Sequence, residues 1–349
     1  MPFPPIREAD IQGLKFFHAL LPRLKQLHDV GCQRDQAGSR QLHFDQYCVL
    51  MLLAMFSPLV NSLRSLQRAS ELPKVQKRLG VKRVSLGSLS EAVAVFDPER
   101  LRASVEEFAA SVPPLTSDPR LAELQHAVTL VDGTILTALP RIAAAFWSGQ
   151  PASRRNFAWR LHTHFEVLRG QPNKFTLTDP RNAGPSSERQ VLRQQLEPDR
   201  CYVLDRGLQS VPLFNAIAAA QSSYVCRIQE KTKLEVLKES PLSDAARQQH
   251  IVHDALVKLG DGQSPDHPVR VVTLEITPHV KRSGHKGDAG PANQGLLVIA
   301  TNLLDVPAEI IALLFAYRWQ IELFFRFFKC LLGCQHLFSR LRYGILIQS

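Results

Sequence analysis

The chain has 349 residues, of which 45% are hydrophobic and 21% are charged, a composition that is ordinary for a folded globular protein. It contains no apolar run of the roughly 18 to 20 residues that a membrane-spanning helix needs, and its first residues lack the basic start and apolar core of a signal peptide, so we expect an intracellular protein. Lysines and arginines number 42 against 32 acidic residues, and this surplus of positive charge favours a polyanionic partner such as nucleic acid.

The first 111 residues are predicted to be helical. Residues 14–27 are amphipathic, with an internal proline that is expected to kink or break the helix. Residues 44–56 are mostly apolar and predict a second helix. Ser88 and Glu91 have the spacing of a capping box, in which the serine hydroxyl and the glutamate carboxylate accept the first free amides of a helix. A further helix is therefore predicted to begin at Ser88.

A basic segment precedes that expected helix. Five cations and no acid occur within ten residues: Lys74, Lys77, Arg78, Lys82 and Arg83. Such a segment is consistent with contacts to a DNA backbone and equally with a solvated surface loop, and both interpretations remain open. Residues 112–119, rich in proline and small polar side chains, predict a linker.

After this linker, strands are expected to alternate with helices. The β-branched and apolar runs predict strands at 127–133, 161–168, 174–178, 201–205, 224–228 and 296–302, and helices at 186–196 and 211–220. Residues 230–292 interrupt this rhythm with many polar side chains, one strand-like piece at 269–276 and a basic loop at 281–287. We therefore expect an α/β domain over 121–349 with an insertion at about 230–292, preceded by the helical region 1–111.

Three acidic residues occupy unusual places in this pattern. Asp132 interrupts an apolar strand, Asp205 ends another, and Glu322 lies in an aromatic helical segment. On an ideal helix, Glu322 lies about 40° around the axis from Arg318, and Lys329 lies about 20° from Arg318. One carboxylate and two cations therefore share one stripe of the helix. Because an unpaired buried carboxylate is disfavoured, the three acids together favour a site for a hard divalent cation such as Mg²⁺ or Mn²⁺. Each acid by itself is also compatible with a turn or a surface ion pair.

The spacing of these residues resembles a known family. Arg318, Glu322 and Lys329 match the last three places of a Tyr-Arg-Glu-Lys signature, with three and six intervening residues. Residues 131–133 (Val-Asp-Gly) resemble the first-acid motif of the same family, and residues 204–207 (Leu-Asp-Arg-Gly) the second. Over roughly residues 44 to 339 the chain resembles the DDE transposases of bacterial insertion sequences, specifically the insertion-sequence-four group.

The resemblance implies a ribonuclease H-like core with a β-rich insertion, preceded by a helical N-terminal domain that binds DNA. It implies a metal-binding and catalytic triad of Asp132, Asp205 and Glu322 that holds two Mg²⁺ or Mn²⁺ ions, with Arg318 and Lys329 as DNA contacts. The implied reaction is phosphodiester hydrolysis at transposon ends followed by 3′-hydroxyl strand transfer into target DNA. Terminal inverted repeats, target DNA and a second copy of the chain in a synaptic complex are the implied partners. The bacterial cytoplasm, in association with the nucleoid, is the implied location.

Two departures from the family pattern leave an alternative open. Phe315 occupies the signature tyrosine position, and the nearby Tyr317 lies about 200° further around an ideal helix. The chain also ends 20 residues after Lys329, where family members usually continue. The alternative is therefore a catalytically inactive, truncated DNA-binding remnant of a transposase, and a nuclease without strand transfer is a third, weaker hypothesis.

Other ionisable residues near the expected strands could have further roles. His162 and His164 alternate on one strand and so face the same side, where we expect packed core or surface histidines in preference to metal ligands. Glu166, Asp179 and Glu188 are spare acids that would replace a triad member if the motif assignment is shifted.

Overall fold

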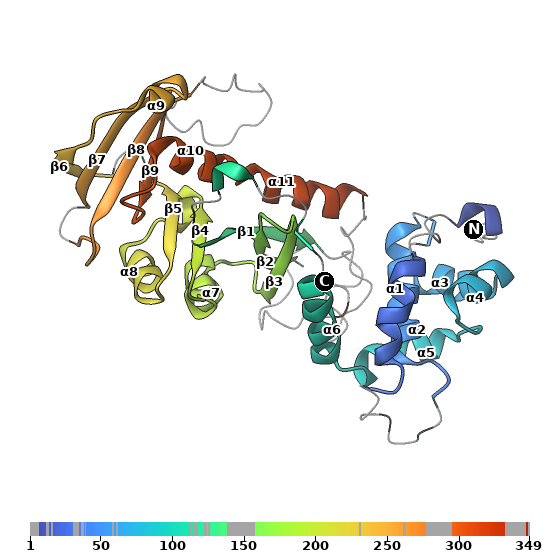
Figure 1. Ribbon diagram of the computed structural model, residues 1–349. Helices are drawn as coiled ribbons and strands as arrows, with labels where there is room; N and C mark the ends of the chain where they lie inside the picture. Colours follow the sequence, from blue (N-terminus) through green and yellow to red (C-terminus); the bar gives the residue numbers. More distant parts are fainter. Residues whose placement is uncertain are drawn as a thin grey trace, which may run out of the picture.

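The structure is a computed structural model of the chain (Figure 1). It describes residues 7–331 and residue 347, except for residues 12–13, 15–16, 31–34, 36–37, 39, 58, 61, 112, 115–117, 122–123, 125, 138–157, 230–231, 261–262 and 277–294. The basic loop expected at 281–287 lies outside the described residues.

In the described part of the N-terminal region the α-helices are α1 (Phe17–Leu24), α2 (Phe44–Phe56), α3 (Leu63–Ser70), α4 (Pro73–Leu79), α5 (Leu86–Val95) and α6 (Pro98–Ser111). Helices α1 to α5 enclose an apolar cluster that is centred on Phe44, Tyr47 and Phe96. The predicted apolar helix is confirmed as α2, and the amphipathic segment contains α1 with Pro22 inside it, followed by a 3₁₀ turn.

The predicted helix start at Ser88 is wrong. Helix α5 begins at Leu86, and the side chain of Ser85 accepts the backbone N–H of Ser88 at 3.0 Å. Ser85 is therefore the N-cap residue, because its side chain accepts the backbone N–H of the residue three positions later, which has no partner within the helix. Both serines suit the role by their chemistry, and the choice between them depends on how the preceding chain packs.

Among the residues that the structure describes, nine strands form one mixed sheet: β1 (Ala127–Thr137), β2 (Ala158–Glu166), β3 (Gln171–Thr178), β4 (Arg200–Leu204), β5 (Ser223–Arg227), β6 (Leu234–Glu239), β7 (Ile251–Leu259), β8 (Val269–Glu275) and β9 (Leu296–Thr301). Their order across the sheet is β3-β2-β1-β4-β5-β9-β8-β7-β6. The first three strands pair antiparallel, while β1, β4 and β5 run parallel to one another. This order and these directions make the first five strands a ribonuclease H-like core.

The strands of the expected insertion continue the same sheet. β9 pairs antiparallel with β5 on one side and with β8 on the other, so β8, β7 and β6 extend the core sheet outward (Figure 1). A short helix, α9 (Asp244–Gln248), lies between β6 and β7. The sequence pattern predicted β8, whereas β6 and β7 were not predicted.

Each face of the sheet packs against its own helices. Leu130 and Val203 belong to an apolar cluster with α10 (Ala308–Ala316) and α11 (Trp319–Arg326). Tyr202 and Leu204, the alternate residues of β4, belong to a second cluster with α7 (Glu188–Gln194) and α8 (Val211–Ala219). Successive side chains of a strand point to opposite faces of the sheet. Membership of one cluster or the other therefore shows which face a core side chain lies on.

The C-terminal helical segment is interrupted. α10 ends at Ala316, Tyr317 and Arg318 form a tight turn, and α11 starts at Trp319. Pro307 precedes the first residue of α10, and no side-chain hydrogen bond caps this helix. A π-helical turn, Phe327–Leu331, follows α11. Within the described residues, no helix is long and apolar enough to cross a membrane.

Candidate active site

Asp132 of β1 and Asp205, which directly follows β4, lie on the same face of two adjacent parallel strands. Leu130 of β1 is in register with Val203 of β4, and each aspartate stands two residues further along its chain. Two residues restore the facing of a strand side chain, so both aspartates lie on the face that α10 and α11 cover. Neighbouring strands are about 4.8 Å apart. The fold thus brings the two acids to neighbouring positions beneath α11.

One arginine joins the strand acid to the helix acid. The Arg318 Nη1 atom lies 3.8 Å from Asp132 Oδ2, and its Nη2 atom donates a hydrogen bond to Glu322 Oε1. The pairing of Arg318 with Glu322 is the four-residue contact that the sequence stripe predicts. It forms although the helix is interrupted at Arg318. Asp132 and Glu322 are 190 residues apart in the sequence (322 minus 132), and the fold brings them to one shared cation.

Burial dominates the electrostatics at Asp132. Burial raises the pKa of the Asp132 carboxyl to about 6. The backbone N–H of Gly133, which donates to Asp132 Oδ1 at 2.8 Å, and the positive charge of Arg318 lower this pKa, while the charges of Glu188 and Asp205 raise it. A carboxylate that burial and like charges destabilise gains from any further cation placed beside it.

Asp205 supplies the observation that tests whether a cation fits. In the part of the chain that the structure describes, the Oδ1 atom of Asp205 is buried and has no hydrogen-bond partner. A buried carboxylate oxygen without a donor is unfavourable unless an ion or water meets it. With Asp132 and Glu322 held at one guanidinium, the oxygen donor set suits a hard divalent cation.

Glu188 approaches the same strand from the opposite face. It begins α7, pairs with Arg160 of β2, and fills the space next to Gly133, where any added Cβ atom would collide with the Glu188 carboxylate. Glycine at position 133 thus permits this close approach. The sequence offered Glu188 only as a spare acid, and its effect on the Asp132 pKa could not be predicted without the packing of α7.

The comparison with protein families decides the class of the chain. Residues 123–345, well over half of its length, match the family model described as the transposase DDE domain. The chain belongs to the DDE transposase family. Membership implies a dependence on divalent metal, in agreement with the acidic donor set.

One relative in sequence is itself described as a transposase. The chain is 32% identical over 174 residues to the "Putative transposase y4zB" of Sinorhizobium fredii (strain NBRC 101917 / NGR234). This match covers 49% of the chain and 44% of the relative, so the chain spans less than half of that protein's length. Among solved structures, the piggyBac transposase in its synaptic complex with hairpin DNA aligns with a TM-score of 0.43 and 10% identity, over 99% of this chain and 74% of that one.

The Tyr-Arg-Glu-Lys signature of this chain departs from the expected pattern at its first place. Phe315, at the tyrosine position, packs against the apolar cluster beneath α10. The Tyr317 hydroxyl donates to the Asp118 carboxylate, which Arg120 also contacts. These hydrogen bonds hold the pKa of the Asp118 carboxyl well below its usual range. Tyr317 therefore binds the segment before β1, and assignment to the insertion-sequence-four group remains a prediction.

Lys329 lies apart from the regular part of α11. It is half-buried within the π-helical turn that follows the helix. A π turn holds more residues than an α turn, so the angle that an ideal helix predicts between Arg318 and Lys329 does not apply. Its expected contact with DNA remains a prediction.

The two histidines of β2 lie on the sheet face opposite to the acids. His162 and His164 are in register with Gly133 and Val131, whose face α7 covers. Burial lowers the pKa of each imidazole to about 4, and His162 Nε2 is 2.7 Å from the Thr178 hydroxyl. These are packed neutral histidines.

The remaining spare acids form ion pairs elsewhere. Glu166 contacts Arg169 at 3.2 Å, and Asp179 contacts Arg181 at 2.8 Å. No described contact brings either of them to Arg318.

Proposed function

We propose that this chain is a DNA transposase that hydrolyses phosphodiester bonds at transposon ends and joins the freed 3′-hydroxyl to target DNA. The observation that supports this most strongly is the convergence on one guanidinium: Asp132 and Glu322 both contact Arg318. Asp205 follows the adjacent strand on the same sheet face and has a buried oxygen without a described partner. Asp132 lies in β1, Asp205 directly follows β4 and Glu322 lies in α11, so the three proposed ligands come from separate elements that the core sheet brings together.

In this proposal Asp132, Asp205 and Glu322 hold two Mg²⁺ or Mn²⁺ ions. When bound, such ions activate a water or a 3′-hydroxyl and stabilise the leaving oxygen of an in-line phosphodiester displacement. The packing of β1 and β4 fixes the two aspartates, because their strands are buried and hydrogen-bonded to each other. The apolar residues of α11 hold Glu322 against the same face.

Arg318 would serve as the phosphate contact nearest the acids. Its guanidinium balances the charges of Asp132 and Glu322, which otherwise repel. A planar guanidinium binds phosphate oxygens in pairs, so Arg318 is suited to hold the phosphate at the cut end. Lys329 is proposed as a second contact to the DNA backbone, further along the helix.

The proposed partners are terminal inverted repeats and target DNA, bound by two copies of the chain in a synaptic complex. The N-terminal helices would recognise the repeats. The positive charge of the chain supports an interaction with DNA of any sequence.

Strand cleavage tests the proposal directly. Duplexes that carry the inverted repeats flanking the reading frame would be incubated with purified protein and Mg²⁺ or Mn²⁺. Asp132→Asn, Asp205→Asn and Glu322→Gln should each abolish cleavage and leave binding of the ends intact. Glu309→Gln, in the first turn of α10, is the matched control and should cleave normally. Cleavage retained in any of the three variants would remove that residue from the triad.

A catalytically inactive DNA-binding remnant is the second candidate. The observation that favours it is Phe315 at the signature position, together with the engagement of the Tyr317 hydroxyl by Asp118. End binding without nicking under Mn²⁺ would support the remnant and contradict the transposase. A precleaved 3′ end supplied with a plasmid target separates a transposase from a nuclease, because only a transposase joins them.

A further inference from the structure

A buried threonine lies beside Asp132 on the face of the sheet that carries the acids. Thr163 of β2 is in register with Asp132 of β1, and the two strands are antiparallel. Residues that stand directly opposite each other on antiparallel strands share a face, with Cβ atoms about 4.5–5.5 Å apart. Phe165, two residues further along β2, packs against Phe324 of α11 with ring centroids 5.7 Å apart. Thr163 therefore lies on the face that α11 covers.

The hydroxyl of Thr163 has no hydrogen-bond partner in the part of the chain that the structure describes. The residue is fully buried, with 0% of its surface exposed. A buried hydroxyl without a partner costs free energy, whereas a valine would fill almost the same space without that cost. Packing alone therefore does not account for a hydroxyl at this position.

Asp132 stands between two buried oxygens that lack a described partner. Thr163 Oγ1 is on the side of β2, and Asp205 Oδ1 is on the side of β4. The Asp132 carboxylate has room for another donor: Oδ1 accepts the Gly133 N–H at 2.8 Å, and Oδ2 lies 3.8 Å from the Arg318 guanidinium. Because a carboxylate only accepts hydrogen bonds and a hydroxyl can donate one, the chemistry of Thr163 suits Asp132.

We propose that Thr163 is a positioning residue of the cation site, whose hydroxyl donates to the Asp132 carboxylate and holds it towards a bound ion. Rotation about the side-chain torsions of the two residues spans the cross-strand distance between them. Carboxylates that bind metal are usually hydrogen-bonded in this way, and loss of the partner typically weakens metal binding about 10- to 100-fold. The inference rests on the proposed function, because it needs a cation at the acids.

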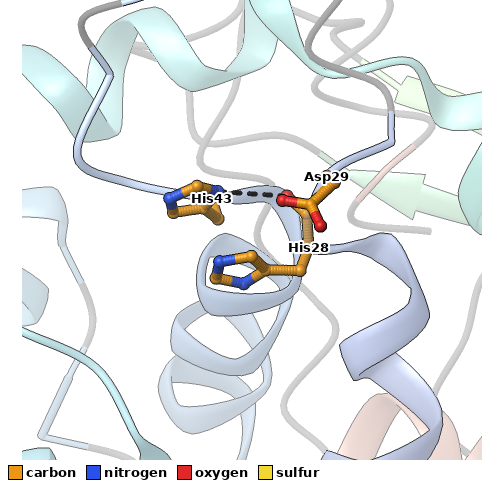
Figure 2. A group of neighbouring side chains, drawn as sticks. All are labelled: His28, Asp29 and His43. Atoms are coloured by element: carbon orange, nitrogen blue, oxygen red, sulfur yellow. Dashed lines mark hydrogen bonds between the residues drawn. The ribbon is translucent and has the colours of Figure 1, made fainter.

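A group of histidines in the N-terminal region does not compete for this ion. One possible ligand atom from each of His28, Asp29 and His43 lies within 4.8 Å of the other two (Figure 2). The imidazoles stack, with centroids 3.8 Å apart and planes 11° from parallel, so their in-plane lone pairs are not directed at one ion. Each Nδ1 also faces an acceptor, Asp45 for His28 and the His28 backbone oxygen for His43. These residues form a packing contact, and His43→Gln should leave the affinity for Mn²⁺ unchanged.

The affinity of the full chain for Mn²⁺, measured without DNA by isothermal titration calorimetry, tests Thr163 separately from cleavage. Thr163→Val removes the hydroxyl at almost constant volume and should weaken Mn²⁺ binding about 10- to 100-fold. Thr163→Ser keeps a hydroxyl and should restore most of the affinity. Thr129→Val is the matched control, because Thr129 is also buried but lies on the opposite face of β1. It should bind Mn²⁺ as the wild type does.

Urea denaturation distinguishes a positioning hydroxyl from a structural one. In EDTA, Thr163→Val loses no hydrogen bond, so its denaturation midpoint should equal or exceed that of the wild type. Added Mn²⁺ stabilises the folded chain by mass action and should raise the midpoint of the wild type more than that of Thr163→Val. A valine variant that is less stable than the wild type in EDTA would show a structural role and overturn the inference.

The outcome also separates this inference from the proposed function. If the wild type binds Mn²⁺ and cleaves transposon ends, and Thr163→Val binds Mn²⁺ equally well, only the role of Thr163 is wrong. If the wild type binds no Mn²⁺, or if Asp132→Asn with Glu322→Gln binds it as the wild type does, the cation site and the role of Thr163 are both wrong.

Discussion

The side chain of His164 has its pKa lowered to about 4 by burial in β2 and, to a lesser extent, by the positive charge of Lys174. In the unfolded chain an ordinary histidine has a pKa of about 6.5. The unfolded state therefore binds more protons between these two values, and the free energy of unfolding falls as the pH drops from about 6.5 towards 4. At about 1.4 kcal/mol per pKa unit, this histidine alone accounts for a loss of about 2–3 kcal/mol.

Replacing this imidazole should reduce the loss. In His164→Leu, the difference in unfolding free energy between pH 7 and pH 4.5 should be smaller than in the wild type, as measured by urea denaturation at each pH. His162, whose pKa is shifted in the same direction, keeps part of the effect. His18→Leu, at an exposed position, is the control and should leave the difference unchanged. If His164→Leu and the wild type lose the same unfolding free energy between pH 7 and pH 4.5, His164 is not a source of the loss of stability in acid.

At this scale the sequence predicts the acids better than their surroundings. Asp132 and Asp205 stand out because a carboxylate in an apolar strand is unusual, and Glu322 because of its spacing from Arg318. The approach of Glu188 to Gly133 was not predictable, because it depends on how α7 packs across the sheet. Local patterns identify a residue that is out of place but do not identify its long-range neighbours.

Among the elements, β8 connects the extended sheet to the segment that leads into α10. Arg270 of β8 is buried and binds Asp254 of β7 through two hydrogen bonds, of 2.8 and 2.7 Å. Its remaining Nη1 donates to the backbone oxygens of Leu303, Leu304 and Val306. The arginine thereby fixes the chain immediately before the helices that carry Arg318 and Glu322.

Removing only the arginine should be strongly destabilising. Arg270→Met leaves the Asp254 carboxylate buried without its cation, and breaking such a pair typically costs about 3–5 kcal/mol. The double variant Arg270→Met with Asp254→Leu removes both charges and should be less destabilised than the single one. Urea denaturation of both variants and of the wild type measures the difference. Equal losses in the single and double variants would show that the ion pair itself contributes little.

The elements that the sequence predicted are those with a strong local pattern. The helix at α2 and the strands β4, β5 and β9 were expected within one or two residues, because each is a compact apolar run. β6 was not expected, since every one of its residues is exposed and only its pairing with β7 makes it a strand. Pairing between distant segments has no local signature, and for the same reason the extension of the core sheet through β9 was not predicted.

For the whole molecule, positive charge is the property that most directly governs an encounter with DNA. The chain carries a formal net charge of +10. Part of it lies on the basic segment at α4, where Lys77, Arg78 and Lys82 are exposed. The two other cations of that segment have described contacts within the protein: Lys74 Nζ donates to the backbone oxygen of Glu8 at 3.2 Å, and Arg83 Nε lies 3.1 Å from the Glu71 carboxylate. Lys77, Arg78 and Lys82 have no such contact among the described residues, so these three are the cations expected to meet phosphate.

This expectation can be measured as a salt dependence. Each phosphate contact that is lost should reduce the slope of log affinity against log salt by about 0.9, so Lys77→Ala, Arg78→Ala and Lys82→Ala together should reduce it by about 2 to 3. Fluorescence anisotropy with a random-sequence duplex at several salt concentrations gives this slope. The matched control changes three exposed cations far along the chain, Lys238 of β6, Arg247 of α9 and Lys258 of β7, to alanine. If both triple variants keep the wild-type slope, the segment at α4 is a solvated surface; if only the control keeps it, α4 lies on DNA.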